Sequence, residues 1–179
     1  MLNQISPAKT PTTQTEDAVD LLVACHQRIR HFTEASSKLA HAQSVSLDEI
    51  RSASAGVYRY FSVSLPLHEA DEEETLRPRL NSTGDERIRH ALLAMHDQHM
   101  AIDELIERLS PLLLLLERNP ASLGEVGGEM CSITKALQDV FDAHLKLEEE
   151  VLFPAIRELL PGNERAAMLS EMRSRRQQG

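Results

Sequence analysis

Two segments of the sequence carry the same chemically active residues at the same spacing. Residues 68–78 read HEADEEETLRP and residues 144–154 read HLKLEEEVLFP, so each has a His, a Glu four positions later, a second Glu, a Leu and a Pro. Residues four positions apart lie on one face of an α-helix, so the His and the first Glu of each segment face the same way. Imidazole and carboxylate groups are both metal ligands. The ligands predicted from these segments are His68, Glu72, His144 and Glu148.

Two further histidines lie on the apolar faces of predicted helices, where a buried imidazole would need a polar partner. His26 follows the periodicity of Leu22, and His99 follows that of Ile102. A single inward-facing His is most often a hydrogen-bonded core residue. Two of them opposite two His/Glu pairs favour a metal site instead, because burying six such donors without a metal would cost much free energy.

Four imidazoles and two carboxylates exceed what one zinc ion needs, so we expect two metal ions with shared carboxylates. The donor types suit iron, zinc, copper and nickel and do not choose among them. The alternative is a metal-free helical interaction module in which the His/Glu pairs are surface salt bridges.

Other polar residues near these positions are weaker candidates for the metal site. The second Glu of each segment, Glu73 or Glu149, is rotated by about 140° from its His, so we expect both to face away from the site. His96 could reach the rim of the site, and Asp103 is a candidate ligand or hydrogen-bond acceptor four positions after His99. Cys25 is rotated by about 100° from His26, which argues against a redox role. We expect the remaining histidines not to be ligands: His31, His41 and His90.

The elements that must position these residues are helices. Helical periodicity, caps and breakers predict helices over residues 16–42, 46–77, 85–109, 125–160 and 164–176. The sequence SLDE at residues 46–49 has the form of a capping box. Pro66 should kink or bulge its helix just before His68. The predicted fold is all-α, an antiparallel four-helix bundle with a short C-terminal helix.

We expect three parts along the chain: a flexible N-terminal arm at 1–13, the bundle at 14–162, and a C-terminal helix with its tail at 163–179. The tail sequence RSRRQQG is interpreted as a solvated helix end.

Composition limits the partners and the compartment. The chain has 179 residues, of which 41% are hydrophobic and 3% aromatic, so one domain with an aliphatic core is expected. A net charge of −9 argues against nucleic acid as a partner. The sequence shows no signal peptide or membrane span, and its two cysteines are too few for a disulfide framework. A cytoplasmic location is therefore expected, and the oligomeric state stays open.

The repeated His-x-x-x-Glu-Glu segments resemble the hemerythrin-like, or HHE cation-binding, domain family, over about residues 16–160. The motif HxxxEExxLFP, typical of this family, is complete at 144–154, whereas Arg77 replaces the Phe in the other copy. The resemblance implies a non-haem centre of two Fe ions, oxo- or hydroxo-bridged. The residues that it assigns as ligands are His26, His68, Glu72, His99, His144 and Glu148.

The family resemblance also implies binding of a small gaseous or anionic ligand (O2, NO or peroxide), for sensing, storage, or protection and repair under oxidative or nitrosative stress. An enzyme that consumes peroxide or reduces NO is the alternative. Oxygen-carrying members place two His four apart on the third helix, whereas Asp103 and Met95 flank His99 at that distance here. The missing imidazole favours reaction with NO or peroxide over stable oxygen carriage.

Overall fold

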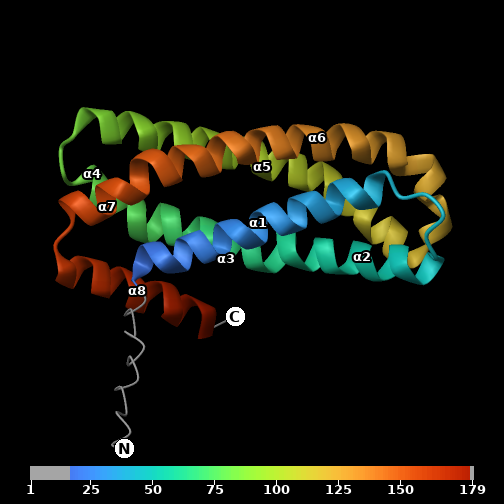
Figure 1. The fold of residues 1–179 in the computed structure, drawn as a ribbon, viewed down its shortest axis with the longest axis horizontal. Helices are drawn as coiled ribbons and strands as arrows, with labels where there is room; N and C mark the ends of the chain where they lie inside the picture. Colours follow the sequence, from blue (N-terminus) through green and yellow to red (C-terminus); the bar gives the residue numbers. More distant parts are fainter. Residues whose placement is uncertain (1–16, 178–179) are drawn as a thin grey trace, which may run out of the picture.

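The computed structural model describes residues 17–177, so the predicted arm at 1–13 lies outside the described residues. These residues form four long helical rods that run side by side, and a shorter C-terminal helix lies along the outside of the bundle near one end (Figure 1). The prediction of an all-α, antiparallel four-helix bundle with a C-terminal helix is confirmed. The elements in chain order are α1 (Ala18–Ala40), α2 (Leu47–Arg59), η1 (Tyr60–Ser64), α3 (Leu65–Ala70), η2 (Asp71–Leu76), α4 (Arg77–Asn81), α5 (Glu86–Arg118), η3 (Pro120–Ser122), α6 (Leu123–Leu147), η4 (Glu148–Leu152), α7 (Phe153–Leu159) and α8 (Gly162–Gln177).

Side-chain caps fix where three of the rods begin. Asp17 and Asp20 form a capping box at the start of α1, and Ser46 and Glu49 form the predicted one at the start of α2. Asp85 accepts hydrogen bonds from two backbone N–H groups at the start of α5. Each cap satisfies backbone donors that have no partner inside the helix.

Proline produces a π-helical turn at three places in the second and fourth rods. The segments η1, η2 and η4 are π-helical, and each is followed, after one residue, by Pro66, Pro78 or Pro154. Proline lacks the N–H that would pair with the carbonyl four residues earlier, so the residue before it bonds five residues back. The bulge predicted before His68 is confirmed.

Two predicted helix ends are wrong. The second rod passes through Pro78 as α4 and ends at Asn81, because the π-helical turn absorbs the proline. The third rod passes through Pro111 and ends at Arg118 rather than at residue 109. Leu113 and Leu116, which follow Pro111, are buried, and their packing outweighs the loss of one backbone hydrogen bond.

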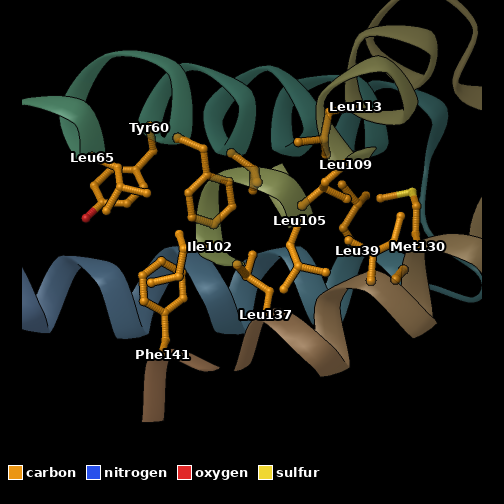
Figure 2. Packing of buried hydrophobic residues seen from close by; sticks show 14 of the residues in the cluster. Leu39, Tyr60, Leu65, Ile102, Leu105, Leu109, Leu113, Met130, Leu137 and Phe141 are labelled. Carbon is orange, nitrogen blue, oxygen red and sulfur yellow. The ribbon is translucent and has the colours of Figure 1, made fainter. Parts of the chain in front are cut away.

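Two hydrophobic clusters fill the bundle, one in each half. Figure 2 shows the first, where side chains such as Leu109, Leu137 and Phe141 interlock between the rods. The second cluster lies at the other end and includes Met168 and Met172 of α8. The C-terminal helix is therefore packed into the core of the bundle.

The interpretation of the C-terminal arginines as a solvated helix end is wrong for Arg175 and Arg176. Both form ion pairs with Asp71, whose side chain is fully buried. Packing of the methionines of α8 brings its last turn against η2, which the sequence pattern alone did not show. No helix among residues 17–177 combines the length and the apolar character needed to cross a membrane.

Candidate metal centre

A layer of polar side chains separates the two hydrophobic clusters. On the first three rods the predicted ligands come between the residues of one cluster and those of the other, and on the fourth rod His144 and Glu148 flank Leu145, near the end of the first cluster. All six have a relative exposure of 4% or less, so the interpretation of the His/Glu pairs as surface salt bridges is wrong. We call these six residues the polar layer: His26, His68, Glu72, His99, His144 and Glu148.

The four imidazoles of the polar layer point their Nε2 atoms at the two carboxylates. His26 Nε2 is 2.9 Å from Glu148 Oε2, and His68 Nε2 is 2.9 Å from Glu72 Oε1. His99 Nε2 is 3.1 Å from Glu72 Oε2. His144 Nε2 lies between the carboxylates, 3.6 Å from Glu148 and 3.9 Å from Glu72.

These donors divide into two groups that share both carboxylates. One group combines Glu72 and Glu148 with His26 and His68, and in the other the same two carboxylates meet the remaining two histidines. Within each group the ligand atoms lie within 4.8 Å of one another. Each group could hold one metal ion, and the shared carboxylates could bridge the two ions.

An outer ring of acceptors holds three of the four imidazoles by their other nitrogen. His26 Nδ1 is 2.8 Å from Glu149, and His99 Nδ1 is 2.9 Å from Glu73. His144 Nδ1 is 3.2 Å from Gln98 Oε1. A partner at Nδ1 fixes the tautomer and directs the Nε2 lone pair inward, as metal-binding histidines require.

The prediction that Glu73 and Glu149 face away from the site is wrong. Each lies at the flank of its rod, where the neighbouring rod presents a histidine, and each accepts a hydrogen bond from that ring. Both belong to π-helical segments, whose wider turn departs from the 100° spacing on which the prediction was based. A repeated second Glu in the motif was the signal for this role.

The remaining candidates fall outside the polar layer. His96 is partly exposed and its Nδ1 is 3.0 Å from Glu73, so it lies at the rim as predicted. Asp103 is exposed and in neither donor group. The histidines predicted not to be ligands are all exposed: His31, His41 and His90. Gln98 gave no signal in the sequence, because nothing in its local pattern differs from that of a surface residue.

The two carboxylates of the polar layer have pKa values that are shifted in opposite directions. Burial raises the pKa of Glu148 to about 8, and the negative charge of Glu72 adds to this effect. Burial also opposes ionisation of Glu72, but the nearby imidazoles, His68 first, hold its pKa well below the usual value. Burial lowers the pKa of His144 to about 3. Two carboxylates this close need a strong positive neighbour before both can ionise, and metal cations supply that charge.

Buried atoms without hydrogen-bond partners also fit a metal. Glu72 Oε1, Glu148 Oε1 and both ring nitrogens of His68 are buried with no partner in hydrogen-bonding geometry. Leaving such atoms unpaired is costly in a protein interior. Metal coordination would satisfy the inward-facing ones, so the residues present fit a pair of metal ions.

The outer carboxylate Glu149 can be tested separately from the polar layer. We expect Glu149→Ala to weaken metal affinity by about 10- to 100-fold, since His26 loses the acceptor that orients it. The measurement is competition for the metal against a chelator. Glu150→Ala is the matched control, because Glu150 is adjacent and exposed. Equal affinities for the two variants would contradict the role assigned to Glu149.

Comparison with known proteins agrees with the geometry. No curated protein gives a significant match to this chain. The family model described as the Hemerythrin HHE cation binding domain matches residues 17–156, close to the range expected from the sequence motifs. This range includes the first three rods, all but the last three residues of the fourth, and every residue of the polar layer. The chain therefore belongs to the hemerythrin family, and its domain is one that binds metal cations.

Proposed function

We propose that this chain is a non-haem di-iron protein that binds a small ligand, O2, NO or peroxide, for sensing, storage, or protection and repair. The observation that carries the proposal is the pair of donor groups that share Glu72 and Glu148. A single-metal site has no use for a second pair of imidazoles on the far side of the same carboxylates. Two ions with bridging carboxylates use all six donors.

In this proposal, His26 and His68 hold one ion and His99 and His144 hold the other. The ring centroids of the first pair are 5.3 Å apart and those of the second pair 4.8 Å apart. Two imidazoles with carboxylate oxygen are typical of non-haem iron sites that keep open positions. When bound, the metal pair would supply those open positions for the small ligand.

The chain's own residues orient the donors and exclude water. Glu149, Glu73 and Gln98 fix three of the rings through Nδ1. Phe153 packs on the His26 ring with centroids 4.9 Å apart. The two hydrophobic clusters close the polar layer on either side along the bundle axis, so charge within it is poorly screened.

The third rod supports NO or peroxide as the ligand. The positions four residues before and after His99 are Met95 and Asp103, so neither adds an imidazole to the site. Met95 is fully buried and Asp103 is exposed. His96, the nearest other histidine on this rod, is directed at Glu73. Fewer donors leave one ion more open, which favours reaction with NO or peroxide over stable oxygen carriage. Turnover of peroxide or NO would make the protein an enzyme with the same site.

We propose that the protein is located in the cytoplasm, because its free cysteines favour a reducing compartment. Cys25 and Cys131 are both free thiols, and free thiols persist where glutathione and thioredoxin keep them reduced.

The experiment for this function is ligand titration of the iron-loaded protein. Azide, NO and hydrogen peroxide are added in turn while the near-ultraviolet and visible spectrum is recorded. We expect a saturable change with azide and with NO, and either a stable change or repeated consumption with peroxide. Repeated consumption would identify the enzyme. A spectrum that none of the three alters would overturn the proposal, since it would show no open position.

Metal affinity should depend on pH in a defined direction. Burial lowers the pKa of His68 and His99, but the charge of Glu72 outweighs it and leaves both pKa values above the ordinary histidine value. A metal must displace these protons, so affinity should fall as pH falls, beginning above the usual histidine range, by about tenfold per pH unit for each proton displaced. Chelator competition across pH 6 to 8 measures this, and a flat profile would contradict it.

A further inference from the structure

The His68 ring is held differently from the other three imidazoles of the polar layer. Its Nε2 faces Glu72, so Nδ1 is the nitrogen that faces outward, yet neither nitrogen has a partner in hydrogen-bonding geometry. The other three rings each have an oxygen within 3.2 Å of Nδ1. His68 is 2% exposed, so its ring lies inside the bundle.

The group beside the His68 ring is the thiol of Cys25. The Cys25 thiol and the His68 ring line the same pocket of about 220 Å³ between α1, α3 and α8, and, against the effect of burial, the interaction between them lowers the pKa of Cys25 and raises that of His68. Cys25 is 5% exposed and directly precedes His26. A thiol sulfur is a weak hydrogen-bond acceptor, so it can hold an imidazole N–H without the charge that a carboxylate brings.

The C-terminal helix reaches the same thiol. Arg176 Nη2 is 3.6 Å from Cys25 Sγ and 2.6 Å from Asp71 Oδ2, and Arg28 Nη2 is 3.4 Å from the same sulfur. Asp71 is fully buried and directly precedes Glu72. Arg176 therefore links α8 to the residues next to two members of the polar layer. α8 begins after residue 156, where the match to the family model ends.

We propose that Cys25 is the positioning residue of His68, accepting a hydrogen bond from Nδ1, and that α8 holds the thiol in place through Arg176. The proposal rests on the proposed metal site. Sγ as acceptor puts the His68 proton on Nδ1 and directs the Nε2 lone pair inward. The helix beyond the family match thereby becomes part of the metal centre. The ion held by His26 and His68 is the more readily lost of the two, because a thiol is a weaker acceptor for the outer nitrogen of His68 than the oxygens that hold the other three rings.

The test compares four full-length variants by chelator competition for iron and by the azide-dependent spectrum. Cys25→Ala and Arg176→Gln are expected to weaken the binding of one of two irons by about tenfold, a common effect of removing such partners. Cys25→Ser keeps an acceptor in place and should restore most of the affinity and the spectrum.

Arg79→Gln is the matched control. Arg79 attaches α8 to the bundle through Glu164 and Glu171, and its hydrogen bonds and ion pairs within residues 17–177 include neither Cys25 nor Asp71. We expect this variant to lower the unfolding temperature and leave iron affinity unchanged. A helix that serves only stability would give the same iron affinity in Arg176→Gln and Arg79→Gln.

The outcomes separate this inference from the proposed function. Wild-type protein that binds no iron would overturn the proposed function and the inference with it. Wild-type protein that loads normally, together with Cys25→Ala and Arg176→Gln variants that bind iron as tightly as wild type, would overturn the inference alone. If Cys25→Ala does not fold, the iron affinities of Arg176→Gln and Cys25→Ser still test the inference. Both variants keep a polar side chain at the contact and are therefore expected to fold.

Discussion

Replacement of both His68 and His144 by Ala is expected to abolish stable iron binding. Each substitution removes one imidazole from one of the two donor groups, so each ion is left with one imidazole and the shared carboxylates. Losing one of few protein ligands removes much of the binding free energy, and the emptied space lets water compete for the metal. The measurement is iron per chain after anaerobic loading and removal of loosely bound metal.

The control for this double variant replaces two histidines outside the polar layer. His31 and His90 are exposed, so His31→Ala with His90→Ala removes the same chemical groups without touching the site. We expect this control to load iron as the unmodified chain does. Unchanged loading of the His68→Ala, His144→Ala variant would contradict the ligand assignment, and the bundle would then have to bind metal elsewhere or not at all.

The substitution Leu109→Ala is expected to destabilise the protein by about 3 kcal/mol, within the usual range for a fully buried leucine. Leu109 is 0% exposed and lies between Leu105 and Leu113 in the first hydrophobic cluster, as Figure 2 shows. The loss combines the transfer free energy of the side chain with a cavity that the four packed rods cannot fill. Urea unfolding of the metal-free protein gives the free energy of unfolding.

Leu115→Ala provides the comparison for Leu109, because Leu115 is on the same helix and 37% exposed. Its expected effect is within about 0.5 kcal/mol. Both variants should still load iron, since Leu109 and Leu115 follow His99 on α5 by about 15 Å or more along the helix axis. A similar loss of stability in the two variants would show that the first cluster is less tightly packed than the structure indicates.

The ligand set was predictable because helical geometry converts sequence spacing into direction. His68 with Glu72 and His144 with Glu148 are one helical turn apart, and the apolar periodicity around His26 and His99 indicates an inward face. The bundle was predictable for the same reason, with capping residues such as Ser46 marking where a helix begins.

The outer ring was harder to predict, because it depends on contacts between rods. Glu73 and Glu149 point away from the site on an isolated helix and become acceptors only when a neighbouring rod presents a histidine to them. Gln98 acts in the same way toward His144. The π-helical turns add to the difficulty, since they change the angle between successive side chains where the ligands lie.

The parts predicted wrongly are those where packing overrides a local rule. Pro111 stays inside α5 because Leu113 and Leu116 beyond it are buried, and a proline by itself gives no sign of that compensation. Arg175 and Arg176 look solvated in a basic tail, but Met168 and Met172 anchor α8 so that both arginines meet Asp71. These contacts join residues about 100 positions apart, beyond the reach of any sequence pattern.

The most direct test of the central claim is the metal content of the protein loaded anaerobically with iron, measured together with the protein concentration. Two donor groups with shared carboxylates predict close to two iron ions per chain, lost together when Glu72 or Glu148 is replaced by Ala. Binding of a single ion, or of two ions that survive the loss of either carboxylate, would contradict the shared site.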